Sequence, residues 1–118
     1  MAEFHLDATA TDEILAMARR IQTGEGAWVW ASAQLTFEGN EVELNVKGKT
    51  LFIDRLVQRR DTADWWVLDY KSTHVPEQDP ALLAQLGGYR DAVRTIYPKA
   101  IVRAAFLTSQ GRLVEIGT

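Results

Sequence analysis

Residues 65–72 read Trp-Trp-Val-Leu-Asp-Tyr-Lys-Ser, and the other predicted elements are arranged around this stretch. It is almost entirely apolar until its aspartate, which is typical of a strand that is buried on both faces of a sheet. Residues two apart on a strand share a face, so the side chains of Asp69 and Lys71 point in the same direction. The stretch therefore predicts a buried strand that ends in a pair of opposite charges.

The segments around this strand predict a sheet with helices beside it. Upstream, residues 41–47 and 50–59 are expected strands with a turn at Gly48 between them. Downstream, Asp79 and Pro80 are typical of a helix start and predict a helix over about 80–96. The other expected elements are a helix over 9–22, an extended segment at Trp28 and Trp30, and strands over 100–108 and 113–116. This order predicts an α/β fold with a mixed central sheet flanked by helices, because a meander is followed by a crossover helix.

The strand over 50–59 contains an aspartate among apolar residues. Alternation along the strand places Asp54 on one side with Phe52 and Leu56, and it places Ile53 and Arg55 on the other. Arg55 either contacts a phosphate or faces away from Asp54 and pairs with acids at the surface, and we expect the second.

Asp54 and Asp69 both lie where strand core is expected. A carboxylate there costs several kcal/mol unless it is paired, hydrogen-bonded or bound to a metal. One interpretation is a buried salt bridge to Lys71 or Arg55. The other is a metal site, because converging carboxylates repel one another unless a divalent cation lies between them. Oxygen donors without sulfur or histidine suit Mg²⁺ or Mn²⁺, and a lysine beside such an ion suits the hydrolysis of phosphodiesters.

Composition narrows the class of protein. The chain has 118 residues, 47% of them hydrophobic, and no cysteine. These values predict a single globular domain and exclude disulfides, zinc–thiolate sites and iron–sulfur clusters. No apolar run approaches the roughly 20 residues of a membrane span, and the first residues do not resemble a signal peptide. We therefore expect a cytoplasmic protein that does not associate with membranes.

The charge is distributed unevenly along the chain. The net charge is −3, which by itself disfavours a nucleic-acid partner. However, residues 1–46 hold 8 acidic and 2 basic side chains, whereas residues 47–103 hold 10 basic and 7 acidic ones. The second segment is therefore the place to look for an anionic partner.

Three motifs occur in a fixed order: GKTLFIDRL at 48–56, WWVLDYKS at 65–72 and QLGGY at 85–89. Together they resemble the PD-(D/E)XK nuclease superfamily, and within it the C-terminal nuclease domain of RecB/AddA-type helicase–nucleases. That group has the pattern G-x-(I/L)-D-R, a strand ending in D-Y-K-(T/S), and a helix with Q-x-x-x-Y. The resemblance extends over roughly residues 39–108. It implies one nuclease-like domain over residues 1–118 with a restriction-endonuclease-like core of the order αβββαβ.

The resemblance also implies roles for individual residues. Asp54 and Asp69 match the metal-binding aspartates, Lys71 matches the catalytic lysine, and the backbone carbonyl of Tyr70 matches a further metal ligand. An additional glutamate of the family matches Glu41.

Other matches are less direct. Glu43 is the alternative to Glu41, since both lie in the stretch NEVEL. Gln85 and Tyr89 match the helix motif and are expected to contact the substrate, together with Arg90.

The function implied is a DNA nuclease of the exonuclease type that depends on Mg²⁺ or Mn²⁺ and acts in recombination and double-strand-break repair. A helicase region of the same chain or of a partner is expected beside it. The family often has a histidine on a helix near the domain start, and residues 9–22 contain none. The chain is therefore interpreted as a fragment of a larger helicase–nuclease or as a domain that lacks this element. The alternatives are a non-catalytic DNA-binding or interaction module on a nuclease fold, and a metal-free domain with a structural Asp–Lys pair.

Overall fold

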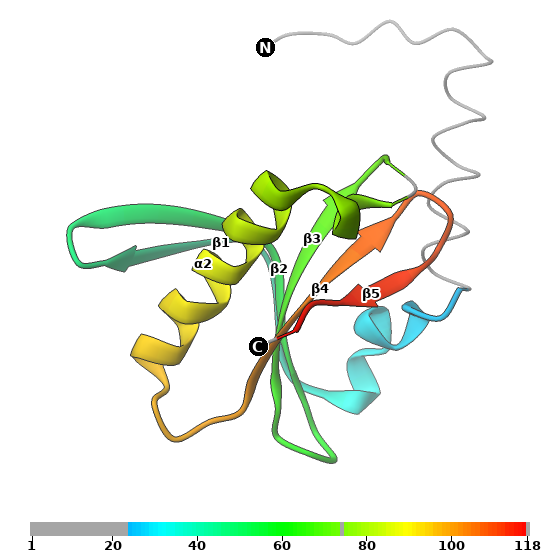
Figure 1. Cartoon of the computed structure of the whole chain (residues 1–118). Helices are drawn as coiled ribbons and strands as arrows, with labels where there is room; N and C mark the ends of the chain where they lie inside the picture. Colours follow the sequence, from blue (N-terminus) through cyan, green and yellow to red (C-terminus); the bar gives the residue numbers. More distant parts are fainter. Residues whose placement is uncertain (1–23, 74, 118) are drawn as a thin grey trace, which may run out of the picture.

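A mixed sheet forms the centre of the structure, a computed structural model that describes residues 24–73 and 75–117 (Figure 1). In sheet order, its strands are β1 (Leu35–Val46), β2 (Lys49–Arg59), β3 (Trp65–Lys71), β4 (Val102–Thr108) and β5 (Leu113–Glu115). The strands β1, β2 and β3 form an antiparallel meander, β3 and β4 are parallel, and β5 runs antiparallel to β4. The predicted mixed α/β sheet is confirmed. The helix expected over 9–22 lies outside the described residues.

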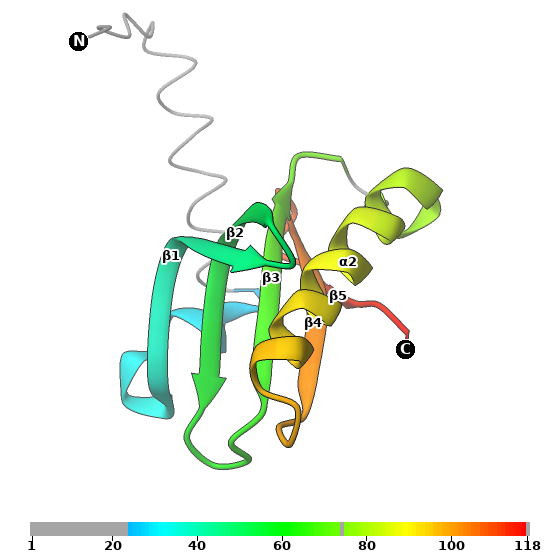
Figure 2. The ribbon, with the colours of Figure 1, turned by 90° about the vertical axis from the view of Figure 1, so that its left-hand side faces the viewer.

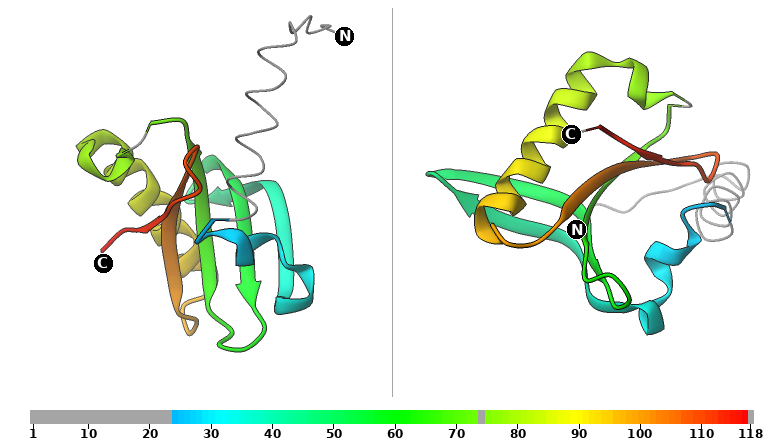
Figure 3. Two further views of the ribbon diagram at one scale, coloured as in Figure 1. Left: turned by 90° about the vertical axis from the view of Figure 1, so that its right-hand side faces the viewer. Right: turned by 60° about the horizontal axis from the view of Figure 1, so that its bottom comes forward.

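Helices lie on both faces of this sheet. The helix α2 (Pro80–Ile96) joins β3 to β4 and covers one face, whereas the short 3₁₀ helix η1 (Ala27–Trp30) lies on the other (Figures 2 and 3). Two further 3₁₀ turns are η2 (Ser32–Gln34) and η3 (Pro76–Gln78). The start of α2 is as predicted, because the Asp79 carboxylate accepts hydrogen bonds from the N–H groups of Ala81 and Leu82.

Each face of the sheet has its own apolar core. The core under α2 consists of Ile53, Leu56, Trp65, Val67, Leu86, Val93, Val102, Ala104 and Phe106. The core under η1 consists of Val29, Leu35, Val57, Trp66, Leu68, Ala105 and Leu107. Successive residues of β3 belong alternately to the two cores, so this strand is buried on both faces, as predicted.

Two local predictions are wrong. Trp28 and Trp30 do not extend toward the sheet but lie in η1. Their rings pack against β3, where Trp28 meets Trp66 edge-on at 5.0 Å and Trp30 stacks on Tyr70 at 6.0 Å between centroids. This long-range packing outweighs the local alternation. The first strand also begins at Leu35 rather than at residue 41, because β1 pairs with nearly the whole length of β2.

The strand β2 does not alternate regularly around its aspartate. Ile53 and Leu56 both belong to the core under α2, although residues three apart on a regular strand face opposite sides. Arg55 faces η1 instead, so the predicted grouping of Arg55 with Ile53 is wrong. On the neighbouring strand, Glu41 has a positive φ of 49°. Such irregularities bend a strand and redirect its side chains.

Arg55 fastens η1 to the sheet. Its side chain is only 4% exposed, and its Nε and Nη2 atoms donate to the Val29 carbonyl oxygen at 3.0 and 2.7 Å. It also donates to Asn40 and forms an ion pair with Glu38, and its guanidinium lies 4.3 Å from the centre of the Trp30 ring. The prediction that Arg55 pairs with an acid is confirmed. Arg55 and Asp54 nevertheless share neighbours, because Asn40 and Trp30 also line the cavity beside Asp54.

Replacing Arg55 with lysine is expected to destabilise the protein by about 1–3 kcal/mol, because one ammonium cannot reproduce this fan of hydrogen bonds in a buried setting. The matched control is Arg59→Lys. Arg59 also lies on β2 and over a tryptophan of η1, but it is more exposed, and within the described part of the chain its guanidinium bonds only to Asp61 at the surface. Urea unfolding measures both variants, and an equal loss in the two would contradict the anchoring role of Arg55.

Candidate active site

The strands β2 and β3 separate at the position of the two aspartates. Their backbone pairing ends at Arg55 and Leu68. Two residues after Leu68, the Tyr70 N–H group donates a hydrogen bond to Asp54 Oδ2 at 3.0 Å. A side-chain oxygen of β2 thus takes the place of a backbone oxygen. The separation leaves room for functional groups between two strands that are otherwise tightly paired.

The carboxyl groups of Asp54 and Asp69 meet in this gap. Asp69 is buried, and it lies close enough to Asp54 for a hydrogen bond between the two side chains. Burial, together with the Asp54 carboxyl group, raises the pKa of Asp69 to about 6, although Lys71 opposes the shift. The structure therefore brings together the two predicted aspartates, which lie on different strands.

Lys71 lies beside this pair, as its spacing from Asp69 predicts. Its Nζ atom is 3.1 Å from Asp69 Oδ2. This distance is that of an ion pair, but the angles are not those of a hydrogen bond. Asp69 Oδ2 is buried and accepts no hydrogen bond from any described residue. The Lys71 side chain is partly exposed, whereas that of Asp69 is not. Among the described residues, the buried Asp69 Oδ2 thus has the Lys71 ammonium beside it but accepts no hydrogen bond of ordinary geometry.

Tyr70 presents its backbone to the same gap. The carbonyl of Lys71 accepts a hydrogen bond from Ser109 and so faces β4. Backbone groups of successive strand residues point to opposite sides, so the N–H and the carbonyl of Tyr70 face β2 and its aspartate. The phenol ring packs on Trp30, and burial raises its pKa to about 12.

A cavity of about 350 Å³ opens next to Asp54. It is lined by Trp30, Asn40, Glu41, Asp54 and Tyr70. Glu41, the preferred glutamate, therefore lies on the cavity wall. Within residues 24–73 and 75–117, no three His, Cys, Asp or Glu side chains come close enough together to share one ion.

The sequence did not predict all the residues of this cavity. Glu43, the alternative to Glu41, lies away from it. Glu43 pairs with Phe52 further along the hairpin. Trp30 and Asn40 carry no local signal of a site, since tertiary folding alone brings them to Asp54.

Of the three helix residues predicted to contact substrate, Arg90 lies apart from Gln85 and Tyr89. Gln85 is exposed, Tyr89 packs partly against the core, and Arg90 is only 8% exposed and donates to the Gly117 carbonyl oxygen. Arg90 is about 140° around the helix from Gln85, because each residue of an α-helix turns by about 100°. The structure thus directs Arg90 toward the C-terminal segment and not toward the acids.

The first motif departs from its pattern at the glycine. Leu51 stands two positions before Ile53, where the pattern has glycine. Gly48 lies in the turn between β1 and β2, where its φ of 76° suits a residue without a side chain. Only the Ile-Asp-Arg part of this motif is therefore matched position by position.

Replacing Asp69 with asparagine is expected to stabilise the metal-free protein at pH 8 by about 1–3 kcal/mol, since a folded-state pKa of about 6 means that ionisation opposes folding. The contribution of Asp69 to stability should be fully present below the ordinary pKa of an aspartate and be lost as the pH rises through about 6, whereas the variant should lack this pH-dependent loss. Urea unfolding in EDTA at several pH values measures this. The exposed Asp91→Asn serves as the control, and a pH profile unchanged by Asp69→Asn would contradict the assignment.

None of the helices among the described residues is long and apolar enough to cross a membrane. In comparisons with known proteins, no individual curated sequence matches the chain. The family model of the PD-(D/E)XK nuclease superfamily matches residues 3–115, which is nearly the full length. Its match agrees with the mixed sheet and with the Asp-Tyr-Lys end of β3. The chain therefore belongs to the PD-(D/E)XK nuclease superfamily.

Proposed function

We propose that this protein is a metal-dependent deoxyribonuclease that hydrolyses phosphodiester bonds. One observation carries the proposal: two aspartates from neighbouring strands meet beside a lysine, and one buried oxygen of the pair has no hydrogen-bond donor. Such an arrangement opposes folding in the absence of a ligand. Proteins retain such a cost where function requires it.

The residues in the gap fit a divalent cation. The carboxylates of Asp54 and Asp69 and the carbonyl of Tyr70 would hold it, with Glu41 assisting from the cavity wall. All of these donors are oxygens, which favours Mg²⁺ or Mn²⁺ over softer metals. When bound, the cation would act as a Lewis acid that offsets the negative charge of the phosphate.

Lys71 supplies the remaining chemistry. Its ammonium group is partly exposed beside Asp69, where it can orient the attacking water and donate to a phosphate oxygen. In the reaction, the water oxygen bonds to phosphorus as the bond from phosphorus to the departing oxygen breaks. The departing oxygen gains the proton that the water loses. Asp69 holds Lys71 in place through their ion pair.

The finer assignment rests on the ordered motifs. The resemblance of FIDRL, LDYKS and QLGGY to RecB/AddA-type nuclease domains supports an exonuclease-type activity on DNA in recombination and double-strand-break repair. It also supports a helicase region, in the same chain or in a partner, as the source of the DNA strand.

Replacing Lys71 with alanine is expected to lower the rate of DNA cleavage by about 100-fold or more, because the variant loses both water positioning and charge stabilisation. Cleavage of linear DNA with Mg²⁺ or Mn²⁺ measures the loss. The control is Lys99→Ala, which removes an exposed lysine in the turn that follows α2. Equal cleavage by the wild type and Lys71→Ala would refute the mechanism.

A saturating concentration of Mn²⁺ is expected to stabilise the wild type by about 2–3 kcal/mol, since a ligand that binds only the folded state shifts the unfolding equilibrium. Asp69→Ala should abolish this gain, because it removes the buried ligand. Thermal unfolding with and without Mn²⁺ measures both proteins. DNA binding without any Mn²⁺ effect in the wild type would instead favour the non-catalytic module.

A further inference from the structure

Phe52 is the most exposed aromatic side chain among the described residues, and it lies on β2 two residues before Asp54. Its side chain is 60% exposed, and it makes no ring contact with another aromatic residue in the part of the chain that the structure describes. Phe37 and Tyr97, by comparison, are also exposed but pack on Trp65. More than half of the Phe52 side chain is therefore open to solvent and available to a ligand.

The position of Phe52 relates it to the two aspartates. Ile53 is fully buried in the core under α2, so the preceding Phe52 points to the other side of β2. On that side Asp54 lines a cavity together with Trp30 and Tyr70. Two residues of a strand span about 7 Å. Successive bases of a stacked nucleic-acid strand are about 3.4 Å apart. A base on Phe52 would therefore lie about two nucleotides from a phosphate at Asp54.

The same hairpin carries positive charge at its tip. The β1–β2 hairpin extends beyond the rest of the sheet (Figure 1), and Lys47 and Lys49 flank its turn. Both lysines are exposed, and neither forms an ion pair with any other described residue. Phosphates are the natural partners of such lysines.

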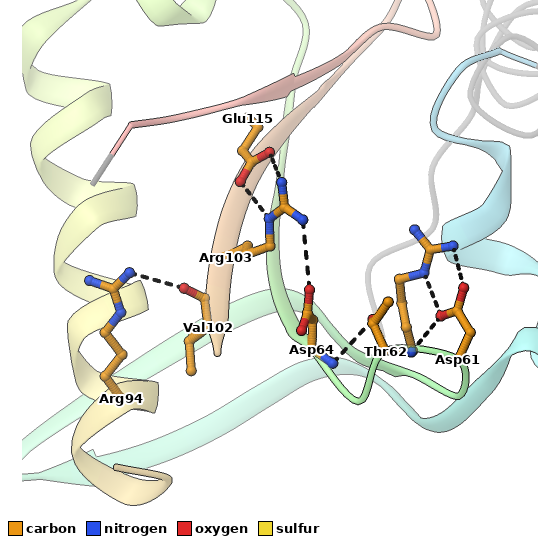
Figure 4. A network of polar contacts seen from close by, with 8 residues as sticks. Asp61, Thr62, Asp64, Arg94, Val102, Arg103 and Glu115 are labelled. Carbon is orange, nitrogen blue, oxygen red and sulfur yellow. Dashed lines mark hydrogen bonds and ion pairs between the residues drawn. The ribbon is translucent and has the colours of Figure 1, made fainter. Parts of the chain in front are cut away.

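Arginines at the opposite end of the sheet are already engaged. Arg103 makes a double hydrogen bond to Glu115 and lies 3.6 Å from Asp64, and Arg94 donates to the Val102 carbonyl (Figure 4). Arg59 in the same region is paired with Asp61. The lysines at the hairpin tip are therefore more available to the phosphates of a nucleic acid than the arginines at the opposite end of the sheet are.

The carboxylate opposite Phe52 limits what can bind there. Glu43 pairs with Phe52 across the hairpin. Its charge repels phosphate but not the flat face of an uncharged base. An aromatic ring beside an acid therefore suits a base, with the backbone displaced toward the lysines.

From these contacts we infer that Phe52 forms a nucleobase-stacking subsite for single-stranded DNA, with Lys47 and Lys49 holding the flanking phosphates. The subsite rests on the proposed nuclease function, because it places the strand that would enter the gap between β2 and β3. Stacking on an aromatic face tolerates any base, so the subsite provides affinity without sequence preference.

The test measures binding of a fluorescein-labelled single-stranded oligonucleotide by anisotropy with Ca²⁺ present, and its cleavage with Mg²⁺ or Mn²⁺. Phe52→Ala is expected to weaken binding about 5- to 100-fold and to raise KM, with kcat little changed. Phe52→Leu should lose as much and Phe52→Trp should bind as the wild type does, because stacking needs an aromatic face. Ile101→Ala, an equally exposed apolar residue at the far end of the sheet, is the control and should bind normally.

A second measurement separates stacking from a change in the hairpin. The oligonucleotides form a series in which a single abasic site is moved along the strand. The wild type should bind one member of this series more weakly than it binds the intact strand. Phe52→Ala should bind that member and the intact strand equally. The inference would be overturned if Phe52→Ala or Phe52→Leu bound the oligonucleotide as tightly as the wild type does. It would also be overturned if the wild type did not bind it at all. A wild type that binds through Phe52 but cuts nothing would refute the nuclease function and leave the subsite standing. If Phe52→Ala binds and cuts DNA as well as the wild type does, the subsite is refuted and the nuclease function stands.

Discussion

The separation of β2 from β3 is the constraint on which the rest of the site depends. Adjacent strands normally satisfy one another's backbone groups, and paired strands leave no space for an ion or a phosphate. Here the pairing ends at Arg55 and Leu68, and Asp54 accepts the hydrogen bond of Tyr70 in place of a backbone oxygen. The Asp54 carboxylate thereby keeps the backbone satisfied while the gap stays open.

The elements around the gap hold it in shape. Arg55, the residue after Asp54, is fixed to η1 through the Val29 carbonyl and the Trp30 ring. On the other side, β3 is paired along its whole length with β4. One wall of the gap is therefore anchored by a buried arginine and the other by a parallel strand. Two carboxylates can approach each other only in such a rigid setting, since their repulsion would otherwise push a loose strand away.

The bend in β2 gives its two faces different tasks. Ile53 and Leu56 both pack under α2, and between them Asp54 and Arg55 turn toward the gap and toward η1. A regular strand would place Asp54 and Leu56 on one face and would bury the carboxylate in the apolar core. The irregularity thus keeps the Asp54 carboxylate out of the apolar core. It also places Phe52 on the side of the cavity rather than on the side of α2.

Much of the fold follows from the sequence alone, because it depends on short-range physics. The apolar run at Trp65–Leu68, the Asp79-Pro80 helix start and the alternation in the hairpin strands each specify a local element. The spacing of Asp69 and Lys71 alone predicts their shared face, because side chains on a strand repeat every two residues. Tertiary structure alone decided the rest: the 3₁₀ turn at Trp28 and Trp30, the bend in β2, the position of Arg90, and the meeting of Asp54 with Asp69. Each of these depends on contacts between residues far apart in the chain, and no local pattern encodes the free energy of such contacts.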